Sequence, residues 1–300
     1  MRVLVTGSQG FVGKRLTPRL EAAGHGVLGF DRDTVDVTEF AAVATVVREF
    51  VPEAVVHLAA VAFVPDASRD PDLAHRVNVG GTQSVIRALE AHAAQARLLL
   101  VGSGDQYPAL EPGAPPLAES TALDPRGTYA TTKAAAEELG RQAAERGLNV
   151  VRVRAFNHTG PGQAPLFVAP DFARQLARIE AGSQEAMRVG NLESVRDFLH
   201  VDDVIDAYMR LLDPAVPADV YNVASGRGTR IGELLESLAT LAGVEPQVEA
   251  DEDRWRPADS RVGDPRRLKD ATGWQPRRPL EETLSELLAY WRVQVREQAP

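Results

Sequence analysis

The chain has 300 residues, of which 44% are hydrophobic and 25% are charged, and its formal net charge at pH 7 is −9. A chain of this length can bury a large core, and its acidic balance excludes non-specific attraction to nucleic acid or to an anionic membrane surface. It has no cysteine, which excludes disulfides, thiolate nucleophiles and cysteine-ligated metals.

The N-terminal segment has one charge and a short apolar run that ends in glycines, without the longer apolar region of a signal peptide. No run of about 18 apolar residues exists, so we expect no membrane span. These features predict a cytoplasmic protein.

The first half of the chain alternates short apolar segments with segments of helical spacing. Near-continuous apolar strands separated by helices predict a parallel sheet covered by helices on both faces. Right-handed crossovers then make it an α/β, doubly wound Rossmann-type sheet. The expected strands are 2–7, 26–31, 54–60, 97–103 and 149–157, and the expected helices are 11–24, 40–50, 78–94 and 128–147.

The regular alternation of apolar strands and helical segments ends after residue 160, where a Gly/Pro loop begins. A further strand is expected at 219–226, helical periodicity covers 226–250 and 280–295, and the stretch 251–268 is polar and rich in arginine. We interpret this half as a smaller C-terminal substrate-binding lobe that is interleaved with the main sheet.

The expected domains are therefore a dinucleotide-binding domain over 1–160, with returns near 196–225, and a mainly substrate-binding lobe over 161–300.

The first expected strand leads into a glycine motif at the start of the first helix. Gly7, Gly10 and Gly13 form G-x-x-G-x-x-G. Glycine permits a tight turn and lets backbone N–H groups approach a pyrophosphate at a helix N-terminus. A strand before the motif and a helix after it predict a dinucleotide-binding loop.

The end of the second expected strand bears on the choice between NAD and NADP. Asp31 lies eighteen residues past Gly13, where an acidic residue hydrogen-bonds the adenosine ribose and favours NAD. Arg32 follows at once and suits a 2′-phosphate or stacking on adenine. The two residues leave the choice open. Asp36 and Val37 lie where a loop can meet the adenine edge.

Tyr129 and Lys133 are four residues apart at the start of an expected helix, and therefore lie on one face of it. An ammonium beside a phenol favours the phenolate and lowers the pKa of the phenol, which can then exchange a proton with a substrate oxygen. Such pairs also occur for packing alone. Because the chain has only three lysines and a dinucleotide loop, we interpret this pair as reactive.

Together with Ser103 in a loop after the fourth expected strand, these motifs resemble the extended short-chain dehydrogenase/reductase family. The resemblance covers essentially the whole chain. Further segments that carry it are HLAA (57–60), NVGGT (78–82), RAFNHTGPGQ (154–163) and RDFLHVDDV (196–204).

The resemblance implies an oxidoreductase in which the Ser103 hydroxyl polarises a substrate carbonyl, Tyr129 transfers the proton, and Lys133 binds the nicotinamide ribose and tunes Tyr129. The implied cofactor is NADP or NAD. Besides Tyr129, Lys133 and the residues at the ends of the first two strands, the implied cofactor contacts are Gly7, Gly10, Phe11, Val12, Gly13, Leu58, Ala59 and Ala60.

Within the family the chain is most similar to reductases that act on GDP-4-keto-6-deoxy-mannose and form GDP-rhamnose. The similarity rests on FNHTGPGQ, FARQLARIEAG, VGNLESVRDF, YNVASGRG and RPADSRVGDPRRL. It implies a GDP-sugar substrate bound across the smaller lobe.

A diphosphate needs guanidinium partners, and Arg196 and Arg256 lie in two of these segments. We expect both at the diphosphate or ribose. Asp259 is expected to accept hydrogen bonds from hydroxyl groups, and Asn157, just past a strand end, to touch the diphosphate or the sugar.

Asp105 separates the enzyme classes. In the dehydratase branch of the family a Glu at this position, two residues after the hydroxyl residue, serves as the elimination base. Aspartate is one methylene shorter, so we interpret Asp105 as a substrate contact and the enzyme as a 4-keto-reductase. A nucleotide-sugar 4,6-dehydratase, a 4-epimerase and a non-enzymatic NADP-sensing module remain alternatives, although sensing members of the family usually lack the Tyr or the Lys.

The remaining polar motifs are expected to be structural. His57 is interpreted as packing beside the cofactor, and Tyr107 as a pocket wall or packing. Asp202 and Asp203 are expected to cap a helix. His158 and His200 lack partners at ligand spacing, so no metal is predicted.

Family members commonly dimerise through the two helices that follow the third and fourth strands, so a homodimer through 78–94 and 128–147 is expected.

Overall fold

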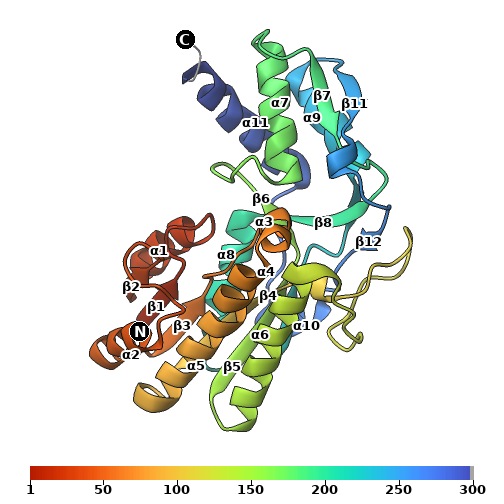
Figure 1. Cartoon of the computed structure of the whole chain (residues 1–300). Coiled ribbons are helices and arrows are strands. Elements are labelled where there is room, and N and C mark those ends of the chain that lie inside the picture. Colours follow the sequence, from red (N-terminus) through yellow and green to blue (C-terminus); the bar gives the residue numbers. More distant parts are fainter. Residues whose placement is uncertain (298–300) are drawn as a thin grey trace.

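The computed structural model describes residues 1–297. At its centre is a six-stranded parallel sheet in the order β2-β1-β3-β4-β5-β9. Figure 1 shows this sheet in the lower part of the molecule and a group of helices above it. Its strands are β1 (Arg2–Thr6), β2 (Gly26–Phe30), β3 (Ala54–His57), β4 (Arg97–Ser103), β5 (Asn149–Ala155) and β9 (Val220–Val223).

Helices cover both faces of the sheet because successive strand residues point to opposite sides. Val3, Val5 and Val56 pack with α1 (Gly13–Ala22), α8 (Val201–Leu211) and α10 (Arg266–Thr272). Leu4 and Val55 pack on the opposite face. The helices there are α2 (Phe40–Phe50), α5 (Gly81–His92) and α6 (Gly127–Glu145).

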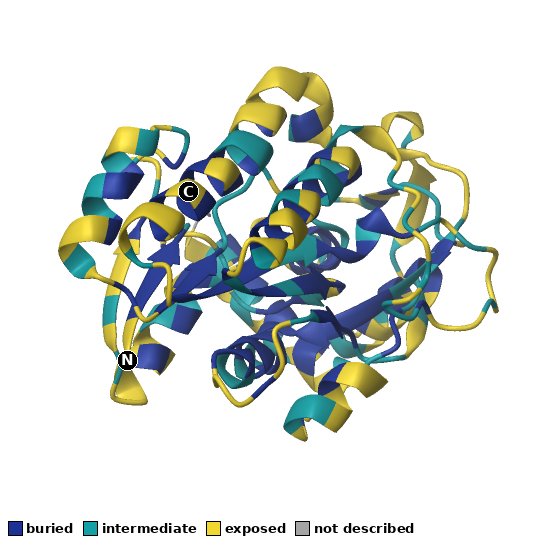
Figure 2. Cartoon of the chain, turned by 90° about the horizontal axis from the view of Figure 1, so that it is seen from below, coloured by how far each residue is buried: buried dark blue, intermediate teal, exposed yellow. Residues whose placement is uncertain are grey.

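Figure 2 shows buried strands enclosed by helices whose outer faces are exposed. This arrangement confirms the doubly wound α/β fold.

Strand β9 joins the sheet from the second half of the chain, where it pairs with β5. Three helices of that half enclose a separate apolar cluster that includes Leu176, Leu234 and Leu287. They are α7 (Val168–Glu180), α9 (Ile231–Ala242) and α11 (Leu280–Glu297). Beside them β7 (Ala186–Val189) and β11 (Gln247–Ala250) form a two-stranded sheet.

A third sheet lies between these two parts of the molecule (Figure 1). Its central strand, β8, pairs with the other three. The strands are β6 (Asn157–Thr159), β8 (Val195–His200), β10 (Gly228–Arg230) and β12 (Ser260–Arg261), and the remaining short elements are α3 (Val64–Arg69), α4 (Pro71–His75), η1 (Arg76–Gly80), η2 (Gly104–Gln106) and η3 (Glu252–Arg254).

Two expectations about local structure are wrong. The helical pattern of 226–250 ends at Ala242, because Gly243 adopts the left-handed conformation (φ 70°) that terminates helices, and the chain continues into β11. Asp202 and Asp203 lie in the first turn of α8 but do not cap it, since the His200 side chain accepts the hydrogen bond from the Asp202 N–H.

Candidate active site

The glycine loop between β1 and α1 has the geometry that a pyrophosphate requires. Gly7 has φ +70°, and a Cβ at this position would lie 2.8 Å from the Ala59 nitrogen. A Cβ at Gly13 would collide with the Gly7 carbonyl oxygen. The backbone therefore forms a cradle that side chains would fill, directly before the N-terminus of α1. Phe11 and Val12 pack against the core beside it, and the residues present fit a bound dinucleotide.

The neighbouring strand ends surround this loop. Leu58, Ala59 and Ala60 follow β3 and are half-buried, and the Ala59 N–H donates to the Thr6 hydroxyl at 3.2 Å. His57 is buried between the hydroxyls of Thr6 (2.7 Å) and Thr82. Burial, and then the nearby Lys133 charge, lower the pKa of His57 to about 3, so it is a neutral packing residue.

The residues after β2 differ in their exposure and in the hydrogen bonds that they make. The Asp31 carboxylate accepts the Asp33 N–H at 3.1 Å and is half-buried, whereas Arg32 is exposed. Asp36 accepts two hydrogen bonds from Thr38. Val37 is buried. An exposed guanidinium thus lies next to a carboxylate held in a turn, and both remain candidates for the adenosine ribose.

Ser103 and Tyr129 meet between two elements. Ser103 ends β4, Tyr129 lies in the first turn of α6, and the Ser103 hydroxyl is near enough to the Tyr129 phenol to influence its pKa. The Ser103 Oγ also accepts the Asp105 N–H at 3.1 Å. The residues expected to act on the carbonyl are therefore brought together.

The protonation states differ from the sequence expectation. Burial, and then the Asp105 charge, raise the pKa of Tyr129 to about 12, against the lowering effect of the Ser103 hydroxyl. The Lys133 Nζ instead donates to the Val101 carbonyl oxygen at 2.5 Å, and burial lowers the pKa of Lys133 to about 8. Tyr129 is thus a neutral phenol at neutral pH, suited to donating a proton.

A cluster of opposite charges stands beside this site. Asp259 pairs with Arg196 at 2.6 Å through one oxygen and with Arg261 at 2.6 Å through the other. Arg261 also approaches the Asp105 carboxylate at 3.9 Å. The cluster therefore connects the expected diphosphate residues with the loop that carries Ser103.

The other expected substrate residues are exposed. Asn157 begins β6. Arg256 donates to the carbonyl oxygens of Asp253 and Trp255, so its guanidinium is held against its own segment. Tyr107, by contrast, is fully buried and donates to Asn222 at 2.8 Å, which makes it a packing residue.

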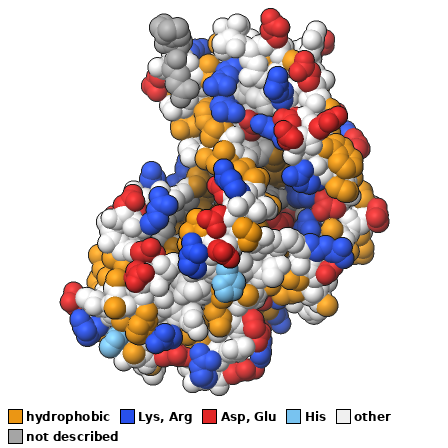
Figure 3. Space-filling model, in the orientation of Figure 1, with side chains coloured by type: hydrophobic (Ala, Val, Ile, Leu, Met, Phe, Trp, Pro, Cys, Tyr) orange, Lys and Arg blue, Asp and Glu red, His pale blue; other side chains and the backbone are white. Residues whose placement is uncertain are grey.

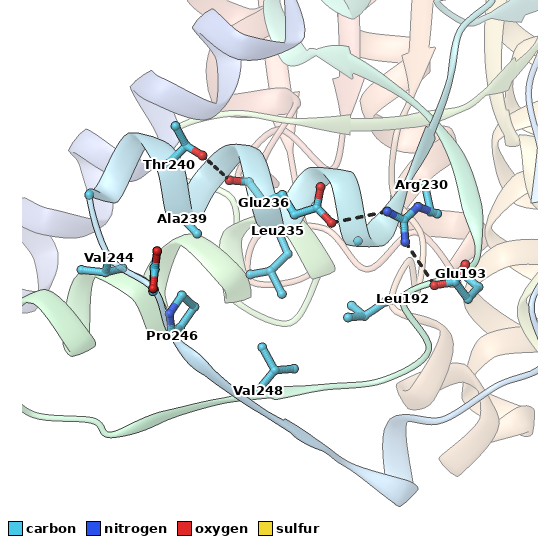
Figure 4. Close-up of a pocket in the computed structure, with 13 residues that line it drawn as sticks. Leu192, Glu193, Arg230, Leu235, Glu236, Ala239, Thr240, Val244, Pro246 and Val248 are labelled. Carbon is cyan, nitrogen blue, oxygen red and sulfur yellow. Dashed lines mark hydrogen bonds and ion pairs between the residues drawn. The ribbon is translucent and has the colours of Figure 1, made fainter.

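A hollow in the second half of the chain is a separate feature (Figure 4). It has a volume of about 650 Å³, lies between α9 and β11, and contains none of the expected site residues. Its rim includes Arg230 paired with Glu193 at 3.1 Å.

Charges on the face shown in Figure 3 are interspersed, with no continuous basic surface there. Within residues 1–297, no three His, Asp or Glu side chains are grouped as metal ligands. No helix of the described chain has the length and apolar content to cross a bilayer.

Comparison with known proteins identifies the family. Residues 3–224 match the NAD dependent epimerase/dehydratase family. The chain belongs to this family. It is accordingly an NAD(P)-dependent enzyme, and the glycine cradle is consistent with that cofactor.

Two relatives of this epimerase/dehydratase enzyme match over nearly its full length. It is 40% identical to the GDP-6-deoxy-D-mannose reductase of Pseudomonas aeruginosa, with 99% of both chains covered. It is 31% identical to a UDP-glucose 4-epimerase of Mycolicibacterium smegmatis, with 97% of this chain and 99% of the relative covered.

The solved structure of the P. aeruginosa protein RMD complexed with NADPH is also similar. It is 38% identical, superposes with a TM-score of 0.89, and covers 98% of this chain and 99% of its own.

Two charged residues next to the expected substrate residues were not predicted from the sequence. Arg261 lies two positions after Asp259, and alternation along a strand puts such residues on one side. Asp197, next to Arg196 and fully buried, accepts hydrogen bonds from Ser225, Gly226 and Gly263. Burial raises the pKa of Asp197 to about 6. No sequence signal marks it, because its partners come from two distant loops.

Proposed function

We propose that this enzyme reduces the C4 keto group of GDP-4-keto-6-deoxy-D-mannose to give GDP-D-rhamnose. The observation that carries the proposal is the 40% identity to a GDP-6-deoxy-D-mannose reductase over 99% of both chains. The juxtaposition of Ser103 and Tyr129 supports it, because a keto-reductase needs a hydrogen-bond donor and a proton donor at one oxygen.

The chemistry follows from the protonation states. A bound reduced nicotinamide supplies a hydride for C4. The Ser103 Oγ accepts the Asp105 N–H, which leaves its own hydrogen for the carbonyl oxygen. Tyr129 is protonated at neutral pH because its pKa is about 12, and it delivers its proton to that oxygen as the alcohol forms.

Lys133 completes the group on α6. It is buried one helical turn after Tyr129, and its Nζ is fixed by the Val101 carbonyl oxygen. In the proposal its remaining N–H bonds hold the nicotinamide ribose.

The substrate is proposed to bind across the third sheet, against residues drawn mainly from 161–300. Two guanidiniums, Arg196 and Arg261, converge on the Asp259 carboxylate, and one of them reaches Asp105. Paired arginines suit a diphosphate, and Asp259 suits ribose or sugar hydroxyls. Asn157 and Arg256, both exposed, are proposed to complete this substrate-binding site.

Turnover of the keto sugar tests the function. Purified enzyme with GDP-4-keto-6-deoxy-D-mannose should oxidise NADPH or NADH stoichiometrically, and Tyr129→Phe should lower kcat by at least about 100-fold while cofactor binding is retained. Redox-neutral conversion of GDP-mannose without oxidation of added NAD(P)H would instead establish a 4,6-dehydratase. Redox-neutral inversion at C4 would establish an epimerase.

The cofactor preference is tested at the end of β2. We propose NADPH, since the similar P. aeruginosa structure holds it and Arg32 is exposed for a 2′-phosphate. Arg32→Ala should raise the KM for NADPH about tenfold and leave that for NADH unchanged. An unchanged ratio of the two KM values would exclude a role for Arg32.

We propose a cytoplasmic homodimer that packs α5 and α6 against their counterparts. The two helices lie side by side at the surface (Figure 1). The family resemblance supports this face as the dimer interface. Light scattering should give twice the 32.4 kDa chain mass; a monomer at working concentration would refute it.

A further inference from the structure

A buried chain of hydrogen bonds connects helix α6 with the loop that carries Ser103. Gln106 is fully buried, and its Oε1 accepts the Ser103 N–H at 2.7 Å. Its Nε2 donates to the Glu137 Oε2 at 2.5 Å. One side chain therefore joins the end of β4 to α6.

The helix end of this connection is fixed independently. Glu137 receives three hydrogen bonds from the guanidinium of Arg154 on β5, at 2.6 to 3.2 Å. Arg154 is in turn held by the Tyr107 hydroxyl at 2.8 Å and stacks over its ring. Glu137 thus cannot move without breaking a buried ion pair.

The position of Glu137 relates it to the reacting groups. It lies one helical turn after Lys133 and two turns after Tyr129, so all three residues share one face of α6. Ser103 is the one member of the reacting group that comes from another element. Its distance from Tyr129 depends on how β4 is held against α6 at this point.

The Gln106 side chain packs closely against the strand that ends in Ser103. A Cβ at Gly102 would lie 2.5 Å from the Gln106 Oε1, so the amide packs directly over the backbone of β4. Both of its polar atoms are used, and both partners are buried.

We propose that Gln106 is a positioning residue: by joining the Ser103 N–H to Glu137 it sets the distance between the Ser103 hydroxyl and Tyr129. This deepens the proposed function and rests on it for the identity of the substrate. Gln106 does not touch substrate. Its contribution is to hold Ser103 where the substrate oxygen meets both hydroxyls.

Gln106→Met tests the proposal, since methionine has a similar length and makes neither hydrogen bond. We expect kcat to fall about 10- to 100-fold with the KM values for substrate and NADPH within threefold of wild type. The solvent deuterium isotope effect on kcat should increase, because proton delivery becomes slower. Gln175→Met is the matched control: Gln175 is a buried glutamine of α7 with similar polar contacts, and its kcat should be unchanged.

A second measurement does not depend on the substrate. Hydrogen exchange followed by mass spectrometry should show faster exchange in a peptide covering residues 102–107 in Gln106→Met, with unchanged exchange over 127–145. This separates the proposal from the proposed function: if wild type fails to reduce the GDP keto sugar, the exchange result still decides whether Gln106 fixes the Ser103 loop.

A double variant, Gln106→Glu with Glu137→Gln, swaps the amide and the carboxylate. The donor and the acceptor between positions 106 and 137 are then reversed, and position 106 keeps an acceptor for the Ser103 N–H. The double variant should restore kcat to within about fivefold of wild type, and it decides the question if Gln106→Met does not fold. Three results would overturn the proposal. They are a kcat of Gln106→Met within twofold of wild type, an equal loss of kcat in Gln175→Met, and a folded double variant as slow as the Tyr129→Phe enzyme.

Discussion

At the scale of single residues, burial rather than pairing sets the chemistry of the reacting group. The spacing of Tyr129 and Lys133 was sufficient to predict a shared helix face. The expectation that the lysine lowers the pKa of the phenol is not met, because Lys133 donates to the Val101 carbonyl oxygen and Asp105 faces Tyr129. A sequence gives the spacing of side chains but not their depth.

Burial of Lys133 predicts the alkaline limit of activity. Its pKa is lowered to about 8, so its ammonium is present below pH 8 and is lost as the pH rises. We expect the kcat of wild type to be about tenfold lower at pH 9 than at pH 7. Lys133→Arg should be slower throughout but level to pH 10, because arginine stays charged.

A pH–rate profile of both enzymes checks this. Lys269→Arg is the control, since Lys269 is exposed on α10 and its substitution should leave the profile as in wild type. A wild-type kcat that is level from pH 7 to 10 would contradict the assignment.

At the scale of elements, the distance between α6 and β4 controls the site. Gly140 lies in α6, and a Cβ there would be 2.6 Å from the Leu100 Cδ2 in the core. Alanine favours a helix over glycine by about 1 kcal/mol, but overpacking a core costs about 1–3 kcal/mol. Overpacking should win, and Gly140→Ala should lower the free energy of unfolding by about 1 kcal/mol and also lower kcat.

Gly80 is the matched control for Gly140. It lies in helical backbone (φ −62°) with open space around a Cβ, so Gly80→Ala should raise stability by up to about 1 kcal/mol and leave kcat unchanged. Urea unfolding of both variants measures the difference. Equal effects of the two substitutions would show that helix propensity alone determines the change in stability.

The elements themselves were predicted unevenly, for physical reasons. Helix 40–50 and strand 97–103 match the structure because their apolar spacing is strong and uninterrupted. Helix α7 was seen only as a segment of family likeness, and the short strands β7, β10 and β11 were not expected. Their pairing partners lie far along the chain, so no local pattern marks them.

At the scale of the whole molecule, ion pairs connect the central sheet with the upper helices. Asp202 in α8 pairs with Arg15 of α1 at 3.4 Å and with Arg278, just before α11, at 3.3 Å. The sequence suggested a helix cap for Asp202, since a single chain position does not reveal partners 187 and 76 residues away. The same limit applies to the pairing of Arg196 with Asp259.

A double-mutant cycle measures what this connection contributes. We expect Asp202→Asn and Arg278→Ala to show a coupling energy of about 1 kcal/mol in urea unfolding at low salt, because the Asp202 side chain is only 24% exposed. The cycle of Asp206→Asn with Arg210→Ala, an i,i+4 pair of similar exposure within α8, should give about 0.3–0.5 kcal/mol. In 0.5 M NaCl both couplings should shrink, because salt screens charges that water reaches. A zero coupling for Asp202 and Arg278 at low salt would show that apolar packing alone joins the two parts.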